Sequence, residues 1–280
     1  MSNLSEVQQA TQMGSISVHA FNALMKDELR QSLVLDVGQA QTYARGHIPG
    51  AVHLPVRYMV RQEGYASGLA PTQAQLIKLA QDYGLWDAKI IYVYDDEGGG
   101  WAGRMAWLLD ILQVKSVVYI DGGVRAWLKA GLPLETVRRS PVSSQTVQSV
   151  NWWPNLTLDE VIQGLQTQEF LFLDARSLGE YTGSRQFAQR AGHIPGALHF
   201  EWTRATNQDQ GSILRPLNLL ASDLEQLGVS QQKVIATYCQ THHRSGLTYL
   251  VCRLLGYEVR AYAGSWSEWG NLSHTPIETA

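Results

Sequence analysis

The chain has 280 residues, of which 45% are hydrophobic and 17% are charged, and its formal net charge at pH 7 is −3. This length suits two domains of the usual size, about 100–150 residues each. A slightly acidic chain offers no basic surface for a phosphate backbone or an anionic membrane, so we expect no nucleic acid and no membrane among its partners.

The cysteine content and the N-terminal segment narrow the class further. Cys239 and Cys252 are too few for a disulfide framework, and no CxxC pair indicates a metal cluster. The chain does not open on a basic segment followed by an apolar one, and no run of about 18 apolar residues occurs. These features predict free thiols and a cytoplasmic location.

Short apolar runs alternate with helix-like patterns along the whole chain. This alternation predicts an α/β fold of two similar domains, each a mostly parallel sheet flanked by helices on both faces. In chain order we expect a strand at 33–37, a helix at 72–85, strands at 91–95, 114–120, 170–175 and 233–238, and a helix at 245–256.

A repeat divides the chain into two copies. The segment GHIPGAVHL at 46–54 recurs as GHIPGALHF at 192–200, and matched positions elsewhere lie 138 to 146 residues apart. Offsets that vary so little indicate duplicated domains whose loops differ in length. The two domains are expected at 1–137 and 152–280, with a polar linker at 138–151.

Cys239 stands at the end of an expected strand, where parallel sheets collect their reactive groups. A helical pattern begins near Ser245, so the letters CQTHHR form a tight loop between strand and helix. Unpaired backbone N–H groups in such a loop stabilise an anion at its centre, which favours a thiolate on the cysteine. The residues expected to form this amide cradle are Gln240, Thr241, His242, His243, Arg244 and Ser245.

The other candidate ligands near this loop do not predict a metal site. His242 and His243 are adjacent and cannot easily converge with Cys239 on one tetrahedral ion, and no fourth ligand lies nearby in the sequence. We expect both histidines to line the mouth of the pocket and to contribute their backbone amides. Cys252 lies on an apolar face of a helical run and is expected to be a core residue.

The chain resembles a tandem-domain rhodanese of the thiosulfate and 3-mercaptopyruvate sulfurtransferase group. YARGHIPGAVHL at 43–54 is similar to the N-terminal signature of that family, and VRAYAGSWSEW at 259–269 is similar to its C-terminal signature. The resemblance covers nearly the whole chain. It implies one active cysteine, Cys239, which carries sulfur as a persulfide, and a catalytically inactive first domain with Asp95 in the cysteine position; no cofactor is implied.

The resemblance also implies the reaction, of the thiosulfate:cyanide sulfurtransferase type. The thiolate takes the outer sulfur of an anionic donor, with thiosulfate favoured, and passes it to cyanide, a thiol or a protein. Because the donor is an anion, cations are expected near the pocket. The candidates are Arg176, two residues after Asp174, and Arg185 and Arg190, which lie in an insert of eight residues found in the second copy alone. A monomer is expected.

Two departures from the family leave the donor open. The loop CQTHHRS matches neither the small, glycine-containing loop of sequences directed to mercaptopyruvate nor the basic residue and Gly-Val-Thr of typical thiosulfate enzymes. In addition, Glu180 stands where the resemblance would place a donor-binding arginine, which argues against mercaptopyruvate in particular.

Two other functions stay open at this point. A sulfur-carrier protein would hold a persulfide on Cys239 for a dedicated protein partner and would turn over small donors slowly. A phosphatase or arsenate reductase uses a similar cradle, but with a C-x5-R loop. Cys239 and Arg244 form C-x4-R, one residue shorter, and a loop of that size suits a sulfur atom better than a phosphate.

Overall fold

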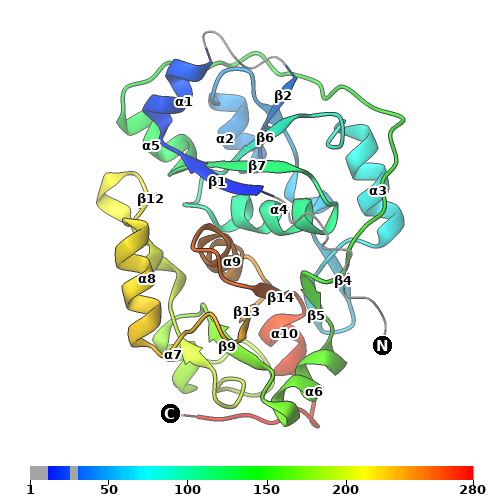
Figure 1. Ribbon diagram of the computed structural model, residues 1–280, viewed down its shortest axis with the longest axis vertical. Helices are drawn as coiled ribbons and strands as arrows, with labels where there is room; N and C mark the ends of the chain where they lie inside the picture. Colours follow the sequence, from blue (N-terminus) through cyan, green and yellow to red (C-terminus); the bar gives the residue numbers. More distant parts are fainter. Residues whose placement is uncertain (1–11, 26–30, 280) are drawn as a thin grey trace.

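The computed structural model describes residues 12–25 and 31–279, which form two similar α/β domains stacked along the long axis of the molecule (Figure 1). Each domain contains a sheet of five strands, and every strand pair in both sheets is parallel. The predicted α/β class and the duplicated architecture are therefore confirmed.

The two sheets have the same strand order. The first is β1 (Gln12–Ile16), β7 (Ser116–Ile120), β6 (Ile90–Tyr94), β2 (Ser32–Asp36) and β3 (Val52–His53). The second is β8 (Asn155–Leu156), β14 (Val259–Tyr262), β13 (Val234–Tyr238), β9 (Phe170–Asp174) and β10 (Leu198–His199). Five strands of these sheets were not among those predicted from the sequence: the edge strands β1, β3, β8 and β10, and the internal strand β14.

Helices cover both faces of each sheet, as predicted. The helices on one face form an outer layer, and those on the other face form an inner layer toward the opposite domain. The outer helices are α1 (Val18–Leu24), α2 (Ala40–Arg45) and α5 (Gly123–Lys129) in the first domain, and α6 (Leu158–Thr167), α7 (Leu178–Thr182) and α10 (Ser265–Trp269) in the second. The inner helices are α3 (Gln73–Asp82) and α4 (Gly100–Ile111), and α8 (Leu217–Gln226) and α9 (Arg244–Leu254). The 3-10 turns are η1 (Val56–Tyr58), η2 (Trp202–Ala205) and η3 (Gln208–Gln210).

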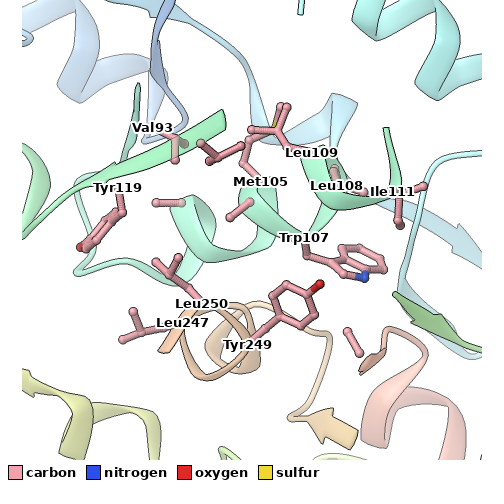
Figure 2. Close-up of a cluster of buried hydrophobic side chains, with 14 of the residues drawn as sticks. Val93, Met105, Trp107, Leu108, Leu109, Ile111, Tyr119, Leu247, Tyr249 and Leu250 are labelled. Carbon is pink, nitrogen blue, oxygen red and sulfur yellow. The ribbon is translucent and has the colours of Figure 1, made fainter. Parts of the chain in front are cut away.

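Helices α4 and α9 pack against each other at the centre of the molecule, between the two sheets (Figure 1). Each helix is buried on nearly all sides because one face meets its own sheet and the other meets the opposite helix. Figure 2 shows Trp107, Met105 and Leu108 of α4 beside Leu247, Tyr249 and Leu250 of α9. These side chains belong to one apolar core that extends through both domains.

Two glycines let the helix backbones approach closely. A Cβ atom added at Gly103 of α4 would overlap the carbonyl oxygen of Gly246 in α9, and one added at Gly246 would crowd Arg104 N and Gly100 O, both at 2.6 Å. The contact is between backbones, so no side-chain rotation can relieve it.

A two-stranded hairpin from each domain reaches across to the other. The hairpin β4 (Arg61–Glu63) and β5 (Ala66–Leu69) touches the second domain, where Ser67 N donates to Ser267 Oγ at 3.2 Å. The hairpin β11 (Thr206–Asn207) and β12 (Ile213–Leu214) touches the first, where Leu214 N donates to Asp121 Oδ1 at 2.7 Å. Each domain thus contacts the other through its own hairpin.

The segment 138–151, expected to be the linker, contains no helix or strand and follows the surface of the first domain. Ser144 N donates to Gln81 O at 2.8 Å, and Asn151 N donates to Ile111 O at 2.7 Å. Among the described residues, no helix combines the length and the hydrophobicity that a membrane span requires.

The helix contact generates a prediction about stability. Gly103→Ala should lower the free energy of unfolding by about 1–3 kcal/mol through overpacking, measured by urea denaturation. Helix propensity acts in the opposite direction, because alanine is favoured over glycine by about 1 kcal/mol in a helix interior. Gly14→Ala in β1 is the matched control, since its Cβ would make an ordinary 3.8 Å contact with Val118. If the two variants are equally stable, the close approach of the helices does not constrain the fold.

Candidate active site

Cys239 follows β13 directly at the carboxyl end of the second sheet and is 1% exposed. Its backbone is fixed by the segment that opens α10: Cys239 N donates to Ser265 Oγ at 3.4 Å, and Trp266 N donates to Cys239 O at 3.0 Å. The next residues, 240 to 243, form a loop that leads into α9 at Arg244. The loop between strand and helix expected from the sequence is present.

The backbone carbonyl groups of this loop are hydrogen-bonded, whereas its backbone N–H groups are not. All five carbonyl oxygens from Cys239 to His243 accept a hydrogen bond. Cys239 O accepts from Trp266 N, and Gln240 O accepts from Ser267 N. Thr241 O and His242 O accept from the Arg104 guanidinium, and His243 O accepts from Gly246 N. The N–H groups of Gln240, Thr241, His242 and His243 donate to no acceptor within residues 12–25 and 31–279. Four neighbouring donors are therefore available to a bound anion.

The first domain shows such a loop with an anion inside. Asp95 occupies the place of Cys239, and its Oδ1 accepts from the amides of Glu97, Gly98 and Gly99 at 3.0, 3.0 and 2.9 Å. Its Oδ2 accepts from Ala102 N at 3.0 Å. The carboxylate is buried and saturated by backbone donors. The repeated loop is thus a cradle for an anion, and in the first copy the side chain of Asp95 occupies it.

The first loop histidine, His242, is part of the core. It is 0% exposed, its φ is +54°, and its ring packs edge-on against Trp107 with centroids 4.6 Å apart. Nδ1 lies 2.8 Å from Ser245 Oγ, and burial lowers the pKa of His242 well below its ordinary value. The expectation that both histidines line the pocket mouth is therefore wrong for His242, because the edge-on contact with Trp107 holds it inside as a neutral ring.

The second loop histidine, His243, bridges the two domains. Its ring stacks on Trp101 with centroids 4.2 Å apart, and Nε2 lies 3.1 Å from Glu97 Oε2 in the loop of the first domain. The hydrogen bond from His243 lowers the pKa of Glu97 from its usual value, outweighing the effect of burial. The two loops are thus in direct contact.

Arg244 forms a bidentate ion pair with Glu180 of α7, with N–O distances of 2.7 and 2.8 Å. Burial raises the pKa of Glu180, but hydrogen bonds and charge from Arg244, with hydrogen bonds from Ser177, outweigh it and lower the pKa to about 2. The pair was not predicted. A local signal did exist, since Ser177 and Glu180 have the spacing of a capping box, which fixes Glu180 in the first turn of α7.

The three arginines proposed from the sequence lie in different surroundings. Arg176 is 1% exposed and is bound to Asp174 at 2.6 Å and to Gly192 O at 2.7 Å. Arg190 donates to Trp269 O, Leu272 O and Thr275 O, which holds the segment after α10 in place. The geometry commits both guanidinium groups to partners inside the protein.

Arg185 is exposed and is linked to the cradle through Phe187. Its guanidinium stacks on Phe187, 4.8 Å from the ring centroid, and Phe187 O accepts a 3.3 Å hydrogen bond from the Gln240 side chain. The side chain of Arg185 donates to no acceptor among the described residues. Of the three candidates, Arg185 is the one whose guanidinium has no hydrogen-bond acceptor among the described residues, and the loop contacts its neighbour Phe187.

Two further residues complete the site. Arg104, from α4 of the first domain, is fully buried and binds the loop carbonyls of Thr241 and His242 at 3.2 Å each. Sequence reasoning did not identify it, because no local pattern links positions 137 residues apart. Cys252 lies within α9, as expected for a core residue, and burial raises the pKa of its thiol to about 12.

Comparison with known proteins agrees with the geometry. The family model described as Rhodanese-like domain matches residues 17–130 and 157–272. A thiosulfate sulfurtransferase of Azotobacter vinelandii is 42% identical over 247 residues, covering 88% of this chain and 90% of the relative. One of Pseudomonas aeruginosa is 41% identical with the same coverage. The sulfur carrier protein TtuD of Thermus thermophilus is 31% identical, covering 84% of this chain and 86% of its own.

Solved structures share the fold at lower sequence identity. EanB is 21% identical, with a TM-score of 0.81 over the whole of this chain and 71% of its own. YnjE is 20% identical, with a TM-score of 0.81 over the whole of this chain and 70% of its own. The two family matches, the extended curated relatives and the two parallel sheets lead to the same conclusion. The chain belongs to the rhodanese family, with two rhodanese-like domains in tandem.

Proposed function

We propose that this protein is a sulfurtransferase that carries a sulfane sulfur on Cys239, with thiosulfate as the donor. One observation carries the proposal: the cysteine sits in a cradle of unpaired amides whose counterpart in the first domain holds a carboxylate. The names of the two relatives at 41–42% identity, both thiosulfate sulfurtransferases, support the donor.

The proposed reaction has two steps. The Cys239 thiolate attacks the outer sulfur of thiosulfate, a new S–S bond forms, and the bond to the sulfonate breaks so that sulfite leaves with its electron pair. The product is a Cys239 persulfide anion, which the amides of Thr241, His242 and His243 stabilise as an oxyanion hole stabilises oxygen. A thiophilic acceptor (cyanide, a thiol or a protein thiol) then takes the outer sulfur and restores the thiolate.

Donor binding is assigned to Arg185 in this proposal. Arg176 and Arg190 are already bonded within the second domain, whereas Arg185 is exposed beside Gln240. We propose further that the first domain spans 1–137, the linker 138–151 and the active domain 152–280, and that the protein acts as a cytoplasmic monomer. His243, Arg244 and Ser245 belong to the cradle through their backbone positions.

A sulfur carrier is the second candidate, favoured by the likeness to a sulfur carrier protein at 31% identity. Such a protein would form the same persulfide but release it slowly to small acceptors. A phosphatase is disfavoured because the loop arginine that would hold a phosphate, Arg244, is engaged at both terminal nitrogens by Glu180.

The central test compares the two cysteines. Cys239→Ser should abolish both the mass gain of one sulfur after incubation with thiosulfate and the formation of thiocyanate from cyanide. Cys252→Ser should retain most of both, because its thiol is buried and its pKa is about 12. Equal losses in the two variants would contradict a single nucleophile. Persulfide without steady-state thiocyanate in the parent would favour the carrier.

The donor site is tested by kinetics. Arg185→Ala should raise KM for thiosulfate several-fold and change kcat less, as expected when ground-state binding is lost. The effect should shrink at high ionic strength, because exposed charges are screened beyond about 8–10 Å. Arg45→Ala, which removes an exposed arginine on α2 of the first domain, is the control. An unchanged KM in Arg185→Ala would mean that the insert is structural.

The ion pair of Arg244 with Glu180 predicts a pH dependence of stability. The pKa of Glu180 is lowered from 4.5 to about 2, so its contribution is fully present above pH 4.5 and disappears as the pH falls through 2. Glu180→Gln should therefore cost about 3 kcal/mol at pH 7 and progressively less toward pH 2, measured by urea denaturation. Glu169→Gln, at an exposed position, should cost little at any pH. A constant penalty for Glu180→Gln would exclude the ion pair as its source.

A further inference from the structure

Arg104 is a buried arginine of the first domain that reaches the loop of the second. It lies on α4, is 0% exposed, and among the described residues all of its hydrogen-bond acceptors are backbone carbonyl oxygens. These acceptors are Met59 O at 2.9 and 3.0 Å, Gly68 O at 2.8 Å, Leu69 O at 3.0 Å, and Thr241 O and His242 O at 3.2 Å each. The guanidinium thus joins η1, the hairpin and the cysteine loop.

The charge of Arg104 has no carboxylate partner. No ion pair joins it to an aspartate or glutamate within the described parts of the chain. Burial lowers the pKa of Arg104 to about 9, and the negative charge of a thiolate at Cys239 would act in the opposite direction. Arg104 therefore stays cationic at neutral pH, and a buried cation of this kind is costly unless an anion balances it.

Two other arginines near Cys239 are paired with carboxylates. Arg176 from the segment after β9 is paired with Asp174, and Arg244 at the start of α9 is paired with Glu180. His242 is held neutral by burial. Of the two arginines near the cysteine that are fully buried, Arg104 and Arg176, Arg104 is therefore the one without a carboxylate partner among the described residues.

Arg104 also sets the direction of the loop amides. In a trans peptide unit the carbonyl and the following N–H point in opposite directions. By holding the carbonyls of Thr241 and His242, Arg104 turns the N–H groups of His242 and His243 to the opposite side. Their counterparts in the first domain, Gly98 N and Gly99 N, are the groups that hold Asp95.

The repeat gives an internal control for this assignment. The 144-residue offset from Asp95 to Cys239 places Thr248 of α9 opposite Arg104 of α4. Thr248 is buried, and its hydroxyl has no hydrogen-bond partner among the described residues. The loop with a permanent carboxylate thus receives no buried cation from the other domain, whereas the loop with a cysteine receives one.

We propose that Arg104 is a positioning residue for Cys239: it aligns two cradle amides and supplies the fixed positive charge that balances the thiolate and the persulfide. The inactive first domain thereby completes the active site of the second. The proposal rests on the sulfurtransferase function proposed above, because it concerns the anionic sulfur of that reaction.

The test titrates the Cys239 thiolate by its ultraviolet absorbance in a Cys252→Ser background, with Cys239→Ser as the blank. Arg104→Met should move the titration midpoint upward by about one pH unit or more, because a neighbouring opposite charge is removed. Arg104→Lys should keep the midpoint within a few tenths of the parent, since the charge remains, but should lower turnover at least tenfold because lysine cannot hold both carbonyls.

Arg253→Met is the matched control. Arg253 lies on α9 in the same interface, but its charge is balanced by Asp110, 2.9 Å away, so the midpoint should stay at the parent value. An Arg104→Met midpoint equal to the parent would overturn the proposal. If Arg104→Met does not fold, Arg104→Lys decides: a raised midpoint contradicts the role of the charge, and unchanged turnover contradicts the role in alignment.

The titration is independent of sulfur transfer. It needs neither thiosulfate nor an acceptor, so a parent protein that forms no persulfide would defeat the proposed function while the Arg104→Met shift could still be measured. Conversely, normal persulfide formation in Arg104→Met with an unshifted midpoint would defeat the role of Arg104 and leave the function intact.

Discussion

The backbone contact between Gly103 and Gly246 is the constraint on which the site depends. It brings α4 and α9 close enough for the loops that precede them to touch through His243 and Glu97. The same approach places the guanidinium of Arg104 within 3.2 Å of the carbonyl oxygens of Thr241 and His242. The packing of two helices thereby determines the electrostatics of a cysteine that belongs to only one domain.

The two loops illustrate how one backbone serves two purposes. In the first domain the cradle binds its own carboxylate, which closes it permanently and stabilises the turn into α4. In the second domain a shorter, titratable side chain leaves the amides available. These four donors have no acceptor among the described residues, and an unsatisfied buried donor is costly. Under the proposed function, the persulfide anion would supply the missing acceptor.

Local sequence patterns predicted several strands and the position of the cysteine, but they did not predict features that depend on contacts between distant segments. Alternating runs predicted the strands β2, β6, β7, β9 and β13, but not the internal strand β14. The repeat located Cys239 and Asp95 at equivalent strand ends. The edge strand at 12–16 was missed, because the letters QMGSI carry a weak apolar signal and gain order from pairing with β7. Arg104 and the partner of Arg244 were missed because both depend on contacts between distant segments. The buried state of His242 depends on Trp107 of the other domain.

The interface resembles that of a symmetric dimer, since α4 packs on its own counterpart α9 and each hairpin clasps the opposite domain. In a dimer of identical chains, every substitution would appear on both sides of such an interface. A substitution that placed a cation beside one loop would then also place a second cation beside the equivalent loop. Joining the copies in one chain removes this restriction, so that Arg104 and Thr248 can differ at equivalent positions. Two copies in one chain therefore permit an asymmetric charge distribution that a homodimer of either half could not attain.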